Sequence, residues 1–291
     1  MGNLRETGLT KQRGRSSRAA GLGALLGAIA LLVVACGGGD EASPPATEEA
    51  PAAETTTTSA ATTTEANEAQ PAAIPVTEPG ARETVTLQIA GNEVDVTIVL
   101  PDDYAPGEPH PILFSLPPGG QAQAQVEFGL DRFWADEAQT RGWIVVSPAA
   151  PEGALFFQGS EAIVPKLLDT IAATYPPEND VFHVAGISNG GLSAFRIATE
   201  SPERFASIVV LPGFPPTEDD LAMIESLVGI PVHMYAGETD TIWVEGSERA
   251  LAALEEVGGQ ATLSIEPNGG HVPAMLTGAE LFEVLEDARP G

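Results

Sequence analysis

The chain has 291 residues, with 13 basic and 41 acidic side chains, a formal net charge of −28 and a single cysteine. Hydrophobic residues make up 43% of it, which is enough to bury a core, so a fully disordered protein is excluded. One cysteine excludes an internal disulfide framework and a cysteine-rich zinc module. The acidity argues against nucleic acid and anionic lipid headgroups as electrostatic partners.

The first 35 residues have the pattern of an export signal. Five basic residues and one acid lie in this stretch, and its second half is an apolar run of about 17 residues, the lower limit for spanning a bilayer. The run ends in Val33-Val34-Ala35-Cys36, which resembles the lipobox of bacterial lipoproteins. That resemblance implies cleavage before Cys36, lipidation of this cysteine and anchoring to the outer face of the bacterial cytoplasmic membrane. An uncleaved membrane anchor with an incidental cysteine is the alternative.

Residues 36–80 are predicted to be a tether. Three glycines follow Cys36, and the rest is mainly alanine, threonine, glutamate and proline. Residues 37–80 hold eight acids, no base and no aromatic residue. Such a composition cannot bury enough surface to fold, so we expect disorder. The sequence therefore divides into a signal peptide (1–35), a lipidated spacer (36–80) and a folded domain (81–291).

From residue 81 onward, the pattern predicts alternating strands and helices. Two alternating runs, 84–89 and 93–100, flank Gly91-Asn92 and predict a β-hairpin. Further strands are expected at 112–116, 143–146, 181–185, 206–211, 231–236 and 261–265, and helices at 128–140, 163–175, 190–199, 221–227, 244–257 and 276–285. This order indicates an α/β fold, with a mostly parallel sheet, helices on both faces, an antiparallel N-terminal hairpin and no large cap.

A serine lies where such a sheet places reactive groups, at the carboxyl ends of its strands. Gly186-Ile187-Ser188-Asn189-Gly190 follows one predicted strand and precedes a helix, so it fits the G-x-S-x-G nucleophile elbow. The helix N-terminus beside Ser188 would help to stabilise an oxyanion. The alternative is a glycine-rich turn in which the serine only caps the helix.

A carboxylate and a histidine follow later strands. Asp240 comes just after the strand at 231–236 and can orient an imidazole, with Glu238 as the alternative acid. His271 lies in a loop after the last strand, on the edge expected for Ser188. The other histidines are expected in the core or at the opposite end of the sheet: His110, His183 and His233. The chain order serine, acid, histidine is that of α/β-hydrolases.

The domain resembles α/β-hydrolases of the polyhydroxybutyrate-depolymerase-like and feruloyl-esterase-like group, over roughly residues 105–290. The matching stretches are Ala185-Gly186-Ile187-Ser188-Asn189-Gly190-Gly191, Ser201-Pro202-Glu203-Arg204-Phe205-Ala206 and Gly269-Gly270-His271. The resemblance implies the α/β-hydrolase fold and a serine esterase that works through an acyl-enzyme. It further implies Ser188, Asp240 and His271 as the catalytic residues, without a metal or an organic cofactor.

The chain departs from that group at the loop expected to hold the oxyanion. Members usually carry His-Gly after the strand that here ends at Leu116, whereas this chain has Pro117-Pro118-Gly119-Gly120. Proline has no N–H, so by position the Gly119 N–H takes the oxyanion role together with the Asn189 N–H. If the prolines bend the loop away, the alternative is a weak or inactive hydrolase-fold lipoprotein that binds an envelope or extracellular ligand.

The cleft is expected to be open and shallow, because no cap is predicted. Phe156, Phe157 and Trp243 fall in loops at the predicted catalytic edge and are candidate walls of an acyl or aryl pocket. Ordinary packing beneath those loops is the alternative for all three. The expected substrate is a small or polymeric carboxylic ester.

Overall fold

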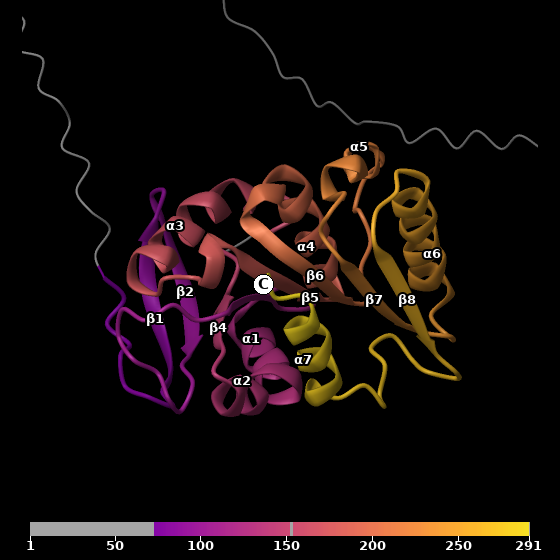
Figure 1. Ribbon diagram of the computed structural model, residues 1–291. Helices are drawn as coiled ribbons and strands as arrows, with labels where there is room; N and C mark the ends of the chain where they lie inside the picture. The colour runs from indigo at the N-terminus through magenta and orange to yellow at the C-terminus, as the bar shows by residue number, and fades with distance from the viewer. Residues whose placement is uncertain (1–72, 152–153, 291) are drawn as a thin grey trace, which may run out of the picture. The chain divides into compact units, whose positions relative to one another are not determined.

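A computed structural model describes residues 73–151 and 154–290 (Figure 1). The expected signal peptide, the lipidated Cys36 and the expected tether up to residue 72 lie outside the described residues. The described strands form one eight-stranded sheet in the order β1-β2-β4-β3-β5-β6-β7-β8. β2 pairs antiparallel with β1 and with β4, and all other neighbours are parallel. The predicted α/β fold with an antiparallel N-terminal hairpin is confirmed.

The hairpin joins β1 (Arg82–Ile89) to β2 (Asn92–Val99) through a two-residue turn. Ala90 and Gly91 in this turn both have positive φ, 50° and 85°. Two positive φ angles give the turn type whose twist matches that of the flanking strands. The antiparallel edge therefore follows from the local sequence.

Four central strands are almost wholly buried: β3 (Ile112–Leu116), β4 (Ile144–Pro148), β5 (Phe182–Ile187) and β6 (Phe205–Leu211). Their continuous apolar runs follow from parallel pairing, which leaves both faces of a strand covered. β7 (Val232–Gly237) is partly buried, and β8 (Ala261–Glu266) forms a more exposed edge. Two separate apolar cores result, one on each face of the sheet.

Helices cover both faces (Figure 1). One face carries α1 (Gln123–Gly129), a π-helical turn (Leu130–Trp134), α2 (Ala135–Arg141) and α7 (Gly278–Asp287). The other carries α3 (Val164–Thr174), α4 (Asn189–Glu200) and α6 (Thr241–Glu256), with the short α5 (Glu218–Ala222) beside α4. Across residues 73–151 and 154–290, none of the helices has the length and apolar character needed to cross a bilayer.

The folded part begins earlier than the composition indicates. Ile74 and Val76 are each 1% exposed. The Ile74 N–H donates to Thr174 Oγ1 at 3.0 Å, and the Tyr175 hydroxyl donates to the Val76 carbonyl at 2.8 Å. Ile74 and Val76, which the composition assigns to the tether, thus pack against the end of α3.

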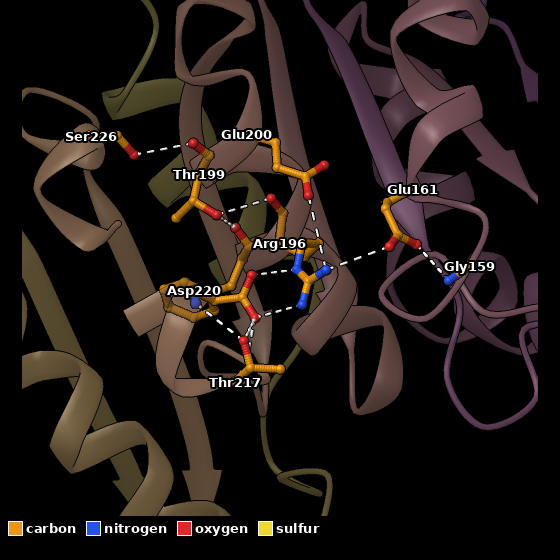
Figure 2. Close-up of polar contacts among 9 residues, drawn as sticks. Gly159, Glu161, Arg196, Thr199, Glu200, Thr217, Asp220 and Ser226 are labelled. Atoms are coloured by element: carbon orange, nitrogen blue, oxygen red, sulfur yellow. Dashed lines mark hydrogen bonds and ion pairs between the residues drawn. The ribbon is translucent and has the colours of Figure 1, made fainter. Parts of the chain in front are cut away.

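An arginine on α4 links this helix to its neighbours (Figure 2). Arg196 forms ion pairs with Asp220 of α5, with Glu161 just before α3 and with Glu200. The hydrogen bond that Arg196 donates to the Asp220 carboxylate raises the pKa of Arg196 above its ordinary value. Asp220 is 1% exposed, and removing one partner of such a buried pair typically costs about 3–5 kcal/mol. The buried pair therefore fixes α4 against α5, and the contact with Glu161 adds the segment that precedes α3.

Candidate active site

Ser188 occupies a sharp turn between β5 and α4. Its backbone angles are φ 56° and ψ −117°, a sparsely populated region for a residue with a side chain. Surrounding contacts hold it there, because the Ser188 N–H donates to the Leu211 carbonyl at 3.1 Å and its carbonyl accepts from Gly191 N–H at 2.7 Å. The predicted strand–turn–helix context of G-x-S-x-G is present, and the turn raises the hydroxyl above the strand ends.

The two glycines of the motif are required by close backbone approach. A Cβ on Gly186 would lie 2.0 Å from the Gly190 carbonyl oxygen. A Cβ on Gly190 would lie 2.1 Å from the carbonyl oxygen of Leu116, the last residue of β3. Any side chain at either position would push the turn open.

Three side chains from separate loops meet in a line above this turn. His271 Nε2 lies 2.7 Å from Ser188 Oγ, and His271 Nδ1 is hydrogen-bonded to Asp240 Oδ2. Glu238, the alternative acid, points elsewhere and accepts from the Asn268 N–H at 2.7 Å. The His271 side chain is 41% exposed and that of Asp240 is 22% exposed. The imidazole is therefore the more accessible of the two groups to solvent.

The loops that carry the acid and the histidine are bonded to each other. Thr239 donates to the Gly269 carbonyl through both its N–H, at 3.0 Å, and its hydroxyl, at 2.6 Å. Arg132 holds the far side of the histidine loop, donating to the carbonyls of Ala274 at 2.8 Å and Leu276 at 3.1 Å. His271 is thus held by contacts on both sides of its loop.

The loop after β3 lies against the first residue of α4. Asn189 Nδ2 donates to the Gly119 carbonyl at 2.8 Å, and Gly119 has a φ of 57°. Within residues 73–151 and 154–290, neither the Gly119 N–H nor the Asn189 N–H donates to another protein group. Both donors remain available at the helix N-terminus, where a negative charge is favoured.

This geometry agrees with a family assignment. The family described as "Putative esterase" matches residues 88–266, well over half of the chain. The chain therefore belongs to the Esterase family. No curated protein sequence matches it significantly.

Solved structures share the fold of this esterase at low sequence identity. A thermostable esterase has a TM-score of 0.57 and 20% identity over 71% of this chain, which spans 62% of that structure. A ferulic acid esterase has a TM-score of 0.53 and 18% identity, covering 72% of this chain and 97% of its own. Fluorophosphonate-binding serine hydrolase F of Staphylococcus aureus has a TM-score of 0.58 and 14% identity, covering 73% and 100%. The family match thus makes this chain a member of an esterase family, and the solved structures show that it shares their fold.

The three aromatic residues predicted at the pocket have different surroundings in the esterase. The Trp243 ring packs edge-on against His271, with 4.8 Å between centroids, and Phe157 is half-buried. Phe156 is fully buried in the core, and its N–H donates to the Gln121 side chain at 2.8 Å. The prediction that Phe156 lines the pocket is wrong, because this hydrogen bond and its core packing turn the residue inward.

Sequence reasoning missed two residues beside the site. Phe214, in the loop after β6, packs on Trp243 at 5.1 Å between centroids and lies against Gly246 of α6. Gln121 is fully buried behind residues 117–120, the loop after β3. Phe214 follows Pro212-Gly213 and Gln121 follows Gly119-Gly120, so position after a glycine at the strand ends is the signal that could have found them.

The remaining histidines lie away from Ser188. His183 is buried between β5 and β6, His233 is half-buried on β7, and His110 lies just before β3. In the described part of the chain, no cluster of three or more histidine, cysteine or acidic side chains has an arrangement suited to a metal ion.

Proposed function

We propose that the esterase cleaves carboxylic esters with Ser188 as nucleophile, His271 as general base and Asp240 as the residue that orients the imidazole. The observation that carries the proposal is the unbroken line of hydrogen bonds from Ser188 Oγ through His271 to Asp240. A strained serine at a strand–helix turn supports it, since such strain concentrates at functional sites.

The reaction proceeds through an acyl-enzyme. Ser188 Oγ attacks the ester carbonyl carbon as His271 Nε2 takes the hydroxyl proton. The tetrahedral intermediate then expels the alcohol, which receives that proton from His271. Water attacks the acyl-serine by the same route, giving its proton to His271 and releasing the acid, and Ser188 is restored. Asp240 stabilises the charged imidazole in both halves.

The oxyanion is held by the backbone N–H groups of Gly119 and Asn189. Catalysis needs both donors about 3 Å from the developing charge, and losing one typically costs about 10²–10³ in kcat. Asn189 contributes in two ways: its backbone N–H is one of the two donors, and its side chain donates to the Gly119 carbonyl. The prolines at 117 and 118 therefore precede a loop that stays beside the elbow.

The substrate is a carboxylic ester of modest size, or an ester at the surface of a polymer. Trp243 and Phe157 supply an apolar wall beside His271. After residue 35 the chain carries 40 acidic and 8 basic residues, so an anionic ester would be repelled on approach.

The esterase is exported and held at the membrane through a lipidated Cys36. The support is the order of the sequence: a basic segment, an apolar run, then Ala35-Cys36. Changing Cys36→Ser should release the protein from the membrane fraction. Continued extraction by detergent alone would instead point to an uncleaved anchor.

A fluorophosphonate probe tests the catalytic proposal. The full chain and its Ser188→Ala variant are treated with the probe, and short p-nitrophenyl esters are assayed in parallel. We expect labelling and turnover that both vanish in Ser188→Ala. Labelling without turnover would mean that the pocket rejects these esters. A folded chain that does not label would favour the ligand-binding alternative.

A further inference from the structure

Gln121 is a buried polar residue behind residues 117–120, the proposed oxyanion loop. Its backbone has a conformation that glycine would adopt more easily. Gln121 is 0% exposed and has a φ of 56°. A left-handed φ is strained for a residue with a Cβ, and the chain has glycine at the two preceding positions. Glycine would relieve the strain at position 121, so the glutamine side chain must offset it through its contacts.

The Gln121 amide joins three segments around Ser188. Its Nε2 donates to the Pro117 carbonyl at 3.2 Å and to Ser193 Oγ, on α4, at 2.9 Å. Its Oε1 accepts from the Phe156 N–H at 2.8 Å. The amide therefore bonds the oxyanion loop, the helix that follows the nucleophile and the segment after β4.

The backbone of Gln121 is also hydrogen-bonded to the loop before it and to the segment after β4. Its N–H donates to the Pro118 carbonyl at 3.0 Å, and its carbonyl accepts from the Ala150 N–H at 2.7 Å. Ser193 in turn donates to the Asn189 carbonyl at 2.9 Å. A buried amide with this many partners is costly to disturb, because each lost partner leaves a polar group without a hydrogen bond.

We propose that Gln121 is a positioning residue that fixes the Gly119 N–H relative to Ser188, so that a loop beginning with two prolines still forms an oxyanion hole. This inference rests on the proposed esterase function. The Pro117 carbonyl is held by the Gln121 amide and the Gly119 carbonyl by Asn189, so the peptide between them is fixed from both ends. Gln121 acts through these contacts and touches no substrate.

The test compares Gln121→Gly with Gln123→Ala in the full chain. Glycine accepts the left-handed φ, so this variant removes the amide without adding backbone strain. Gln123 is the matched control, because it lies two residues away and its side chain donates to Thr97 and Glu127 instead. We expect Gln121→Gly to lower kcat about 100-fold, the effect of misplacing an oxyanion donor, with KM changed less than about threefold.

Two further measurements separate positioning from general damage. The pH dependence of kcat should keep its shape in Gln121→Gly, since His271 and Asp240 are untouched. If that variant does not fold, Ser193→Ala removes one partner of the amide without altering the Gln121 backbone. We then expect about a fivefold fall in kcat at unchanged KM, since one hydrogen bond is worth roughly 1 kcal/mol.

The outcomes distinguish this inference from the function on which it rests. A wild-type chain that neither labels with fluorophosphonate nor turns over esters would overturn the proposed function, and the role of Gln121 with it. An active wild type whose Gln121→Gly variant keeps kcat within threefold would overturn the positioning role alone. So would a variant that loses no more kcat than Gln123→Ala.

Discussion

Two serine–histidine pairs occur at the same distance in the part of the chain that the structure describes. Ser188 Oγ lies 2.7 Å from His271 Nε2 at the carboxyl ends of the strands, and Ser207 Oγ lies 2.7 Å from His183 Nδ1 inside the sheet. The first histidine has a 41% exposed side chain and a carboxylate partner. The second is 2% exposed and packs edge-on against Trp143.

The difference shows that proximity does not make a reactive pair. Ser207 lies opposite His183 in the paired strands β5 and β6, whereas Ser188 sits on a strained turn beside two N–H groups that donate to no group in the described part of the chain. Burial lowers the pKa of His183 to about 4, with Arg289 adding to the shift and Glu178 opposing it. His183 is therefore neutral at physiological pH and serves packing, while His271 is placed to exchange protons.

Replacing each histidine in turn gives the largest contrast. If His271 is the general base proposed above, His271→Gln should lower kcat by about 10⁵–10⁶, the loss typical of removing a catalytic base of this kind, with little change in the unfolding midpoint. His183→Gln should leave kcat within a few-fold but lower the free energy of unfolding by about 1–3 kcal/mol, through lost packing and a disturbed bond to Ser207. Steady-state kinetics and urea unfolding measure both. Equal losses of activity in the two variants would undo the comparison.

The pairs also differ in that His271 is hydrogen-bonded to the carboxylate of Asp240. Asp240→Asn should lower kcat about 10⁴-fold, because an amide favours the wrong tautomer of His271. Glu238→Gln is the matched control, since Glu238 binds the Asn268 N–H and should cost less than tenfold. Ester turnover near pH 7 measures both. A larger loss in Glu238→Gln would show that the assignment of the acid is wrong.

The buried pair of His183 and Ser207 should make the free energy of unfolding depend on pH. In the unfolded chain His183 titrates near 6.5, and in the folded chain near 4. Between these values the unfolded state binds more protons, so this contribution is complete above pH 6.5 and is lost as the pH falls toward 4. The loss is about 3 kcal/mol, at 1.36 kcal/mol per pKa unit. Unfolding at pH 7, 6, 5 and 4 should show His183→Gln losing less stability than the wild type; parallel curves would contradict the assignment.

The aromatic contact of His271 carries the smallest effect. The Trp243 and His271 rings meet at a steep angle of 72°, and Trp243 is itself packed by Phe214. Trp243→Leu should lower kcat about 2- to 5-fold, since an aromatic contact of a cation is worth roughly 0.5–1 kcal/mol at an exposed site. Trp243→Phe should recover most of that loss. Kinetics on a short acetyl ester, which needs no pocket, tests orientation apart from substrate binding.

Much of the fold could be predicted because its signals are local. Alternating and continuous apolar runs predicted the strands, and Gly91 with its neighbours predicted the hairpin turn. The elbow could be located from Gly186, Ser188 and Gly190, since backbone crowding there excludes larger residues. The acid and the histidine followed from chain order and from the edge of the sheet on which each loop emerges.

The rest depends on contacts distant in sequence. The first helix begins at Gln123, five residues before the predicted start, and its N-cap is Ala122 rather than a serine or threonine, with the Ala122 N–H donating to the Gln125 side chain. Phe156 turns inward because its N–H meets Gln121, 35 residues earlier. Ile74 is held by Thr174 at a separation of 100 residues. The composition around position 74 gives no indication that Ile74 will bond to Thr174.

The entry point of the chain has a mechanical consequence. Ile74 and Val76 dock at the end of α3, near Pro177, which bridges to His110 just before β3. This is the amino end of the strands, whereas Ser188 and Gly119 follow their carboxyl ends. The described chain therefore enters the folded domain at the end of the sheet opposite to Ser188, so whatever precedes residue 73 is attached away from the candidate site.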